Sequence, residues 1–232
     1  MKKLVVDTEY GKPAVKIVRY NNVPISKRIG VAKGKLKSPD DLDKYNDEIT
    51  AMFGRSGLQM TRSKATPDEF NSVRLFYHSL IDAIEGSPYH PMWQKDIYPA
   101  PEELKSAIEA GELYTGRLAD RVAAAMVLNQ KCNPEYDEPA WPTTLNHSEF
   151  MVIHMLGVHS DFAGQGLAKE MVRFAIGTAK TAGMKAIRLD VLKGNVPAER
   201  LYTSLGFVYV DTLKLFYEDT GRVDFELYEL EL

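Results

Sequence analysis

The spacing of hydrophobic residues after position 60 predicts helices and strands in turn. Apolar residues recur every three or four positions between Thr66 and Gly86, which is the spacing of a helix with one buried face; they are Phe70, Val73, Tyr77, Leu80, Ile81 and Ile84. Thr66, Pro67 and Glu69 form the capping-box pattern that starts such a helix. A second helix is expected over 101–111, because this segment begins with proline and ends with glycine.

The remaining pattern predicts strands interrupted by two more helices. Residues 112–130 predict two antiparallel strands with a turn at Ala119–Asp120. The expected elements after them are, in order, a polar loop over 131–146, a very apolar strand over 149–158, a helix that ends at Ala182 before Gly183, a strand over 185–191, a helix over 195–206, and strands around 207–217 and 222–230. This order predicts an α/β fold in which helices flank a mixed, twisted sheet.

The first 58 residues form a basic appendage that we expect to be separate from a domain over 59–232. Composition and charge both change at the segment 54–59, GRSGLQ. Residues 1–60 carry 12 Lys and Arg against 7 Asp and Glu, whereas the remainder carries 17 against 25, so a basic arm precedes an acidic body. We expect a small α/β or hairpin-plus-helix unit here, with short strands over 14–20 and 23–26 and a helix within 38–53.

The composition is that of an ordinary soluble globular protein. The chain has 232 residues, of which 44% are hydrophobic and 26% charged, which is enough for a sizeable core. Its single cysteine, Cys132, can form no internal disulfide and by itself no metal site, as is typical of a reducing compartment. No segment reaches the roughly 18 apolar residues of a membrane span, and the first residues lack a signal peptide's apolar run, so we expect a cytoplasmic protein.

The segment 158–170, VHSDFAGQGLAKE, contains residues with little or no side chain at the point where a predicted strand is followed by a predicted helix. Glycine lets an anion approach the backbone, and the unpaired amides of a helix's first turn carry partial positive charge. The segment therefore predicts a phosphate or pyrophosphate site. It lacks the Gly-Lys-Ser/Thr of a P-loop, and Lys169 stands where a dinucleotide fingerprint has its third glycine. The alternative is a tight turn whose glycines serve packing alone.

A second segment indicates which of these two alternatives applies. The sequence NVPAERLYTSLGF at 195–207, together with AGQGLA at 163–168, resembles the GNAT superfamily of acyl-CoA-dependent N-acetyltransferases. The later signature matches at every position, namely Asn195, Ala198, Leu201, Tyr202, Gly206 and Phe207. The earlier one matches at Gly166 and Ala168, but Ala163 replaces the usual Gln or Arg and so removes one side-chain contact to a pyrophosphate. The resemblance covers about 62–232 and implies the GNAT fold.

The resemblance implies a site for acetyl-CoA. The pyrophosphate would lie on the backbone amides of the glycine loop, formed by Ala163, Gly164, Gln165, Gly166, Leu167 and Ala168. The pantetheine arm would pair with the strand end at Leu156 and Val158, and Asn195 would contact the arm with its side chain. Asn195 is also expected to cap its helix, and Ala198 shares a helix face with Tyr202.

The resemblance also implies a general acid for the departing thiolate, and the attacking amine requires a general base. Tyr202 corresponds to the tyrosine that protonates the departing thiolate, a role that suits a phenol with a pKa of about 10, although a plain core tyrosine is the alternative. An attacking amine must first lose a proton, which costs roughly 4.6 kcal/mol at pH 7 for a lysine-like amine and about 1.4 kcal/mol for an α-amine. His154 is the leading candidate base, because on an extended strand it shares a face with Leu156 and Val158, although a bulge at the strand end would change this; Glu149 and Asp190 are the alternatives.

The acceptor site is expected in the variable loops. Tyr89, His90, Trp93 and Tyr98 lie between the first two helices, where the family commonly builds its substrate wall, and Trp141 would form another side. These aromatic residues equally suit packing of the loops onto the core. The acidic body favours a cationic or amine-bearing acceptor, either a small molecule or a peptide, and it argues against nucleic acid.

The basic arm leaves two further functions open. Residues 27–53 resemble the tail of small bacterial antitoxins, which carry a Gly-x-x-Lys-Gly-Lys stretch before an acidic run. One alternative is therefore a toxin-type GNAT enzyme that acetylates aminoacyl-tRNA under the control of its own arm. Another is a non-catalytic, CoA-binding regulatory module. In the simplest case the arm packs on the body or mediates a homodimer.

Overall fold

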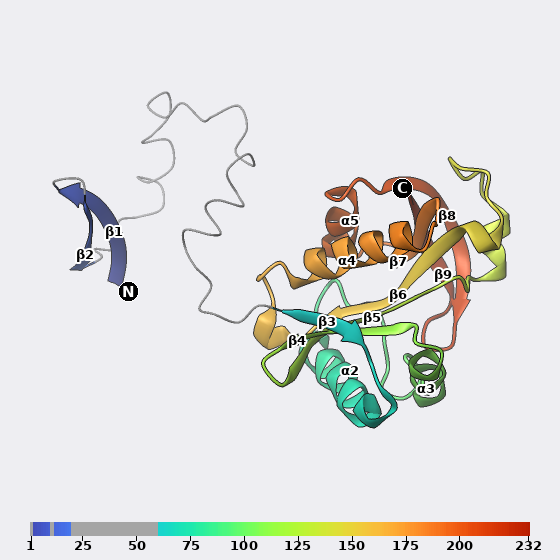
Figure 1. Ribbon diagram of the computed structural model, residues 1–232, viewed down its shortest axis with the longest axis horizontal. Coiled ribbons are helices and arrows are strands. Elements are labelled where there is room, and N and C mark those ends of the chain that lie inside the picture. Colours follow the sequence, from blue (N-terminus) through green and yellow to red (C-terminus); the bar gives the residue numbers. More distant parts are fainter. Residues whose placement is uncertain (1, 10–11, 20–59) are drawn as a thin grey trace. The chain divides into compact units, whose positions relative to one another are not determined.

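The computed structural model describes residues 2–9, 12–19 and 60–232, and the chain divides into two units, Met1–Ser56 and Gly57–Leu232 (Figure 1). In the first unit, β1 (Lys2–Glu9) and β2 (Lys12–Arg19) pair antiparallel, with Lys2 opposite Arg19. β2 contains most of the strand predicted at 14–20. β1 was not predicted, because its apolar run of three residues is too short to show a strand period. The expected strand at 23–26, the helix within 38–53 and the antitoxin-like segment lie outside the described residues.

The second unit is built on a mixed sheet of seven strands, which confirms the predicted α/β class. The strands are β3 (Thr61–Lys64), β4 (Leu113–Leu118), β5 (Arg121–Asn129), β6 (Phe150–Val158), β7 (Ala186–Leu192), β8 (Val208–Tyr217) and β9 (Gly221–Glu231). Their order across the sheet is β3-β4-β5-β6-β7-β9-β8. β6 and β7 pair in parallel, whereas every other neighbouring pair is antiparallel.

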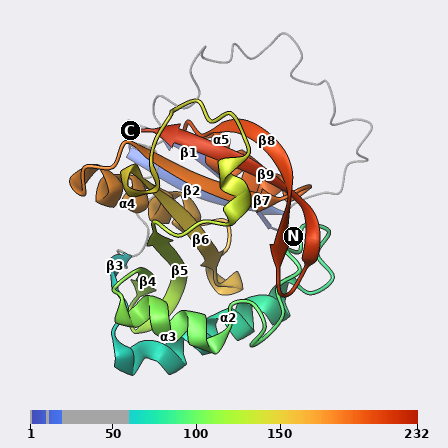
Figure 2. The ribbon, with the colours of Figure 1, turned by 90° about the vertical axis from the view of Figure 1, so that its right-hand side faces the viewer.

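Helices cover both faces of this sheet (Figures 1 and 2). α2 (Phe70–Ile84) and α3 (Pro101–Glu109) pack on one face, and α4 (Leu167–Thr181) and α5 (Val196–Thr203) pack on the other. The predicted capping box is present in the short 3-10 turn over Pro67–Glu69 that leads into α2, where the Thr66 backbone amide donates to the Glu69 carboxylate at 2.9 Å. Each helix contributes one apolar stripe, so the sheet lies between two hydrophobic cores.

The short edge strand β3 is the element of this unit that the sequence did not predict. All four of its side chains are exposed, so it carries no alternation between apolar and polar positions. It exists because its backbone pairs with β4, with Thr61 opposite Arg117.

No helix in the described part of the chain is both long and apolar enough to cross a bilayer.

A third core lies where the loop over 131–146 covers the sheet beside β6, β7 and β9. At its edge the guanidinium of Arg188 pairs with Glu229 at 2.8 Å between Nε and Oε2, and both side chains are buried. The Arg188 guanidinium lies between two rings, 4.0 Å from the centre of Trp141 and 4.1 Å from that of Phe150. This loop is therefore held by a buried, stacked ion pair.

Candidate active site

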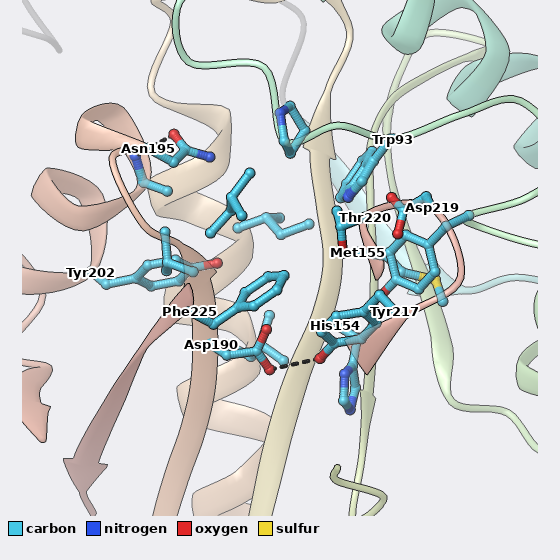
Figure 3. Close-up of a pocket in the computed structure, with 17 residues that line it drawn as sticks. Trp93, His154, Met155, Asp190, Asn195, Tyr202, Tyr217, Asp219, Thr220 and Phe225 are labelled. Atoms are coloured by element: carbon cyan, nitrogen blue, oxygen red, sulfur yellow. Dashed lines mark hydrogen bonds between the residues drawn. The ribbon is translucent and has the colours of Figure 1, made fainter. Parts of the chain in front are cut away.

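The candidate site begins where two neighbouring strands part. β6 pairs with β7 only over Phe150–Val152, which lie opposite Ala186–Arg188. Beyond that point β6 pairs with β5 alone and β7 pairs with β9 alone. The facing edges of the two strands therefore diverge, and a pocket of about 110 Å³ lies between them, lined by residues of both strands (Figure 3).

A β-bulge in β6 shapes one wall of this pocket. Its pairing with β5 shifts register after Val127 and His154, and Met155 has a φ of 55°. The Tyr77 hydroxyl donates to the Met155 carbonyl at 2.8 Å and so holds the bulge from α2. Because a bulge adds one residue to a strand, side chains beyond it point to the face opposite the one that simple alternation predicts.

Tyr202 and Asn195 enter the pocket from the α5 side (Figure 3). Asn195 caps α5, as predicted, by accepting a hydrogen bond from the Ala198 amide at 3.3 Å. Tyr202 is 7% exposed, and no described residue forms a hydrogen bond with its hydroxyl. Burial raises the pKa of Tyr202 well above its usual value, with the nearby Asp190 charge as a smaller cause, so the phenol keeps its proton at neutral pH.

The glycine loop leads from β6 into α4. Gly164 and Gly166 have φ values of 72° and 78°, in the left-handed region that favours glycine. A Cβ added at Gly164 would meet no atom within 4 Å, so this glycine does not serve close packing. The first bond of the helix runs from the Glu170 amide to the Gly166 carbonyl at 3.1 Å, which leaves the amides of Leu167, Ala168 and Lys169 without an intrahelical acceptor. The exposed backbone over 163–166 and these amides fit a phosphate group.

The loop is held in place by contacts at its N-terminal side. The Arg121 guanidinium pairs with the Asp161 carboxylate at 2.6 Å and lies over the ring of Phe162 at 5.0 Å. The His159 amide donates to the Ala123 carbonyl at 2.9 Å. The glycine loop is therefore anchored to the start of β5, and its shape does not depend on α4 alone.

Residues 79–207 match the Acetyltransferase (GNAT) family, and this match spans more than half of the 232 residues. The chain belongs to the GNAT family. This finding confirms the family to which the segments at 163–168 and 195–207 point. It also agrees with the order of helices and strands after residue 62.

Individual proteins are similar to this chain in sequence or in fold. Over 108 residues the chain is 26% identical to the Uncharacterized N-acetyltransferase YesJ of Bacillus subtilis (strain 168), and the match covers 47% of this chain and 59% of that protein. Among solved structures it is similar to a GNAT-family acetyltransferase of Streptococcus agalactiae 2603, with a TM-score of 0.62, 19% identity and coverage of 75% and 95% of the two chains. It is also similar to yncA of Salmonella typhimurium, a putative acetyltransferase solved with acetyl-CoA, with a TM-score of 0.56, 17% identity and coverage of 75% and 94%.

His154 lines the pocket, but on a different face from the one expected. Leu156 and Val158 pack with the core on the α4 side, whereas the bulge residue Met155 packs with the core under α2 and α3. His154 stands two residues after Val152, which belongs to the third core, and so shares that side of the sheet. The expectation that His154 shares a face with Leu156 and Val158 is therefore wrong, because the bulge at Met155 reverses the alternation.

The hydrogen bond of His154 determines which nitrogen is available as a base. Its Nε2 lies 2.9 Å from the Lys131 carbonyl oxygen, which can only accept, so the neutral ring carries its proton on Nε2. The lone pair is then on Nδ1. Burial lowers the pKa of His154, against the opposing charge of Asp190, which favours the neutral imidazole at pH 7.

The two alternative bases differ sharply in their surroundings. Asp190 lines the pocket, and its Oδ2 accepts hydrogen bonds from the hydroxyls of Tyr136 at 2.8 Å and Tyr217 at 2.9 Å. Burial raises the pKa of Asp190, whereas the two tyrosines and His154 lower it. Glu149 does not line the pocket; its carboxylate accepts from the Asn146 amide and pairs with Lys185. Within the described residues, His154 and Asp190 are therefore the candidates that the pocket retains.

The residues expected in the remaining walls are only partly brought together. Leu156, Ala198, Trp93 and Tyr98 line the pocket, but Val158 does not, and it pairs with Ala124 of β5. Tyr89 is 45% exposed and lines neither this pocket nor the adjoining cleft.

Trp141 lines neither the pocket nor the adjoining cleft. Its indole Nε1 donates to the Tyr136 carbonyl at 2.6 Å, and its ring stacks on Arg188. Sequence reasoning placed it at the substrate because its loop precedes the cofactor strand. The loop instead folds over the third core, where an aromatic ring covers a buried charge.

The β8–β9 turn also forms part of the pocket wall, which the sequence did not predict. Tyr217, Asp219 and Thr220 all line the pocket. In the sequence, Asp-Thr-Gly at 219–221 predicts only a turn between two strands. The side-chain amide of Gln94 donates to the Asp219 carbonyl at 2.9 Å, so the pocket wall joins segments 125 residues apart in the chain.

Proposed function

We propose that this protein transfers an acetyl group from acetyl-CoA to a primary amine by direct attack in a ternary complex. The observation that carries the proposal is the lining of the pocket between β6 and β7. Tyr202 and Asn195 line it on one side, and His154 and Trp93 line it on the other, so donor and acceptor would meet there (Figure 3). Membership of the GNAT family supports the reaction class.

The residues present fit acetyl-CoA. The backbone of the glycine loop over 163–168 would hold the pyrophosphate, since its amides are exposed or in a helix's first turn. Leu156 and Asn195 would contact the pantetheine arm, because both line the pocket at the diverging strands. When bound, acetyl-CoA supplies the acetyl group as a thioester. The Salmonella typhimurium relative of this fold was solved with acetyl-CoA, which supports the same donor here.

The side chains of the pocket then have complementary proton roles. Tyr202 holds a proton on its hydroxyl at neutral pH and donates it to the departing sulfur. His154 accepts the proton of the attacking amine at Nδ1, directly or through a water, because its Nε2 is committed to the Lys131 carbonyl. Burial lowers the pKa of His154, and the charge of Asp190 opposes that effect and so stabilises the imidazolium that results.

Cofactor binding is tested by replacing Gly164 with alanine. The added Cβ would meet no protein atom but would occupy the space above the loop where an anion approaches, so acetyl-CoA affinity should fall about tenfold, or ~1.4 kcal/mol. Calorimetric titration with acetyl-CoA and then CoA measures this change. Gly183→Ala is the matched control: its φ of 74° is close to the 72° of Gly164, and its Cβ would also meet no atom within 4 Å. Equal affinity of both variants and the wild type would refute the pyrophosphate site.

The base assignment is tested with His154→Gln on two amines of different pKa. For an amine of pKa about 10.4 we expect kcat/KM to fall about tenfold, and for an α-amine near 8 much less, because deprotonation costs roughly 3 kcal/mol more in the first case. The loss is smaller than the roughly 10²-fold of direct general-base catalysis, since water can still carry the proton. An equal loss with both amines would show that His154 does not act as the base.

The two alternative functions gain no support from the described residues or the relatives. The hypothesis of an enzyme that acetylates aminoacyl-tRNA depends on the antitoxin-like segment, which lies outside the described part of the chain. The non-catalytic reading rests on Ala163, whose side chain is exposed in a loop that still presents its backbone. The acetyl-CoA titration decides between a cofactor-binding site and a packing turn.

A further inference from the structure

Among the described residues the carboxylate of Asp219 has no side-chain partner, and only its own backbone amide and that of Thr220 lie near it. The residue is 9% exposed, and within the described part of the chain neither of its oxygens accepts a hydrogen bond of normal geometry. Burying a carboxylate without a partner is costly, so a site that retains one is suited to a ligand that supplies the missing charge. Asp219 stands in the turn between β8 and β9 and lines the pocket with Tyr217 and Thr220.

Aromatic rings surround this carboxylate. Trp93 and Tyr98 lie edge to face with centres 6.1 Å apart, and Tyr98 and Tyr217 lie in the same way at 5.4 Å. Figure 3 shows Trp93, Asp219 and Tyr217 on one side of β6, opposite Tyr202 and Asn195. The hydrogen bond from Gln94 to the Asp219 carbonyl fixes the loop and the turn against each other. Aromatic faces attract ammonium groups, so the rings and the carboxylate favour the same kind of ligand.

An acidic cleft of about 600 Å³ adjoins the pocket. The two share Tyr98, His154, Met155 and Tyr217. The carboxylates that line the cleft come from α3, the loop that follows it and the β8–β9 turn; they are Glu102, Glu103, Glu112 and Glu218. The cation that lines it, Lys131, is paired with Glu112 at 3.1 Å. A negative path therefore runs from the surface to the neighbourhood of Asp219.

We propose that the acceptor is an aliphatic polyamine, of which Asp219 binds one ammonium group and the carboxylates of the cleft bind another. The uncharged amine that reacts then lies toward Tyr202. An elongated chain is favoured because the cleft continues into the pocket, and several charges are favoured because both parts are acidic. The proposal rests on the proposed function, since it names the acceptor of that same site.

The ionisation of Asp219 agrees with this assignment. Burial raises its pKa to about 6, while the neighbouring amides of Asp219 and Thr220 lower it and Glu103 raises it further. Asp219 is therefore mostly ionised at pH 7.5. Cation binding there therefore requires no release of a proton from the carboxyl group.

The test is a calorimetric titration of the full chain with spermidine, with and without CoA, at pH 7.5. We expect Asp219→Asn to weaken spermidine binding at least about tenfold, because a charged contact is lost, while acetyl-CoA affinity stays within about twofold. Asp120→Asn is the matched control, since Asp120 stands in the β4–β5 turn and lines neither cavity. Glu218→Gln, at an exposed position of the cleft, is a second variant and should weaken binding about threefold.

A companion assay of CoA release compares spermidine with butylamine, which has one amine and an apolar tail. We expect kcat/KM at least about tenfold higher for spermidine. The proposal is overturned if the wild type binds no spermidine under either condition, if Asp219→Asn binds it as the wild type does, or if butylamine or a lysine-containing peptide is the better acceptor. Failure of the wild type to bind acetyl-CoA would instead refute the proposed function, and the titration without CoA would still decide the cation site.

Discussion

Replacing Tyr202 with phenylalanine is expected to lower kcat about 10²-fold or more, while acetyl-CoA affinity stays within about twofold. The change removes one hydroxyl and keeps the ring, which packs edge to face on Phe207 with centres 5.5 Å apart. No described residue forms a hydrogen bond with that hydroxyl, so removing it does not leave another polar group without its partner. Steady-state kinetics with a saturating amine, together with calorimetry for acetyl-CoA, measures the two quantities separately.

Tyr228→Phe is the matched control for this experiment. Tyr228 is also buried and in contact with another ring, but its hydroxyl donates to Glu226 at 2.8 Å and it does not line the pocket. Its kcat should stay within about twofold of the wild type. If Tyr202→Phe retains full kcat as well, the leaving sulfur receives its proton from another source and the acid assignment is wrong.

Replacing Arg188 with methionine is expected to destabilise the fold by about 3–5 kcal/mol and to lower the melting temperature by roughly 10 °C. The Arg188 and Glu229 side chains are 4% and 1% exposed, so the substitution leaves a charged carboxylate buried without its partner. The Arg188 guanidinium also donates to the Thr143 carbonyl at 3.0 Å, and Glu229 accepts from the Thr143 amide at 2.9 Å. Thermal and urea unfolding measure the change in free energy.

Two comparisons isolate the cause. The double substitution Arg188→Met with Glu229→Leu should recover part of the loss, because it removes both charges together. Lys214→Met breaks an exposed pair, in which the lysine is 66% exposed and lies 3.1 Å from Asp224, and it should cost less than about 1 kcal/mol. A loss at Arg188 no larger than that at Lys214 would show that the buried pair contributes little to stability.

The strands and helices that the sequence predicted are those with a strong period. α2, α4 and the strands from β4 onward carry apolar residues at helical or strand spacing, and caps such as Thr66 and Asn195 mark where helices begin. β3 has no such signal, since its four side chains are all exposed and only pairing with β4 makes it a strand. Local pattern therefore predicts an element only where the element buries its own apolar side chains.

The residues of the candidate site also differ in how far the sequence could predict their positions. Gly166, Asn195 and Tyr202 were proposed from two short segments, because each depends on the local geometry of a helix end or a helix face, and Asn195 and Tyr202 do line the pocket. His154 was placed on the wrong face of the sheet, because a bulge held by Tyr77 of α2 reverses the alternation in β6. Trp141 was placed at the substrate, because nothing near it in the sequence reveals that it covers Arg188.

The family, the order of the elements other than β1 and β3, and the segments proposed to hold acetyl-CoA could all be predicted from the sequence, since they depend on residues close together in the chain. The tertiary structure was needed to show where β6 parts from β7, which rings line the pocket, and that the buried Asp219 carboxylate has no side-chain partner among the described residues. Those features depend on contacts between distant segments, such as Gln94 with Asp219. Side chains that meet across such a distance share no local spacing, so a single sequence carries no pattern that would bring them together.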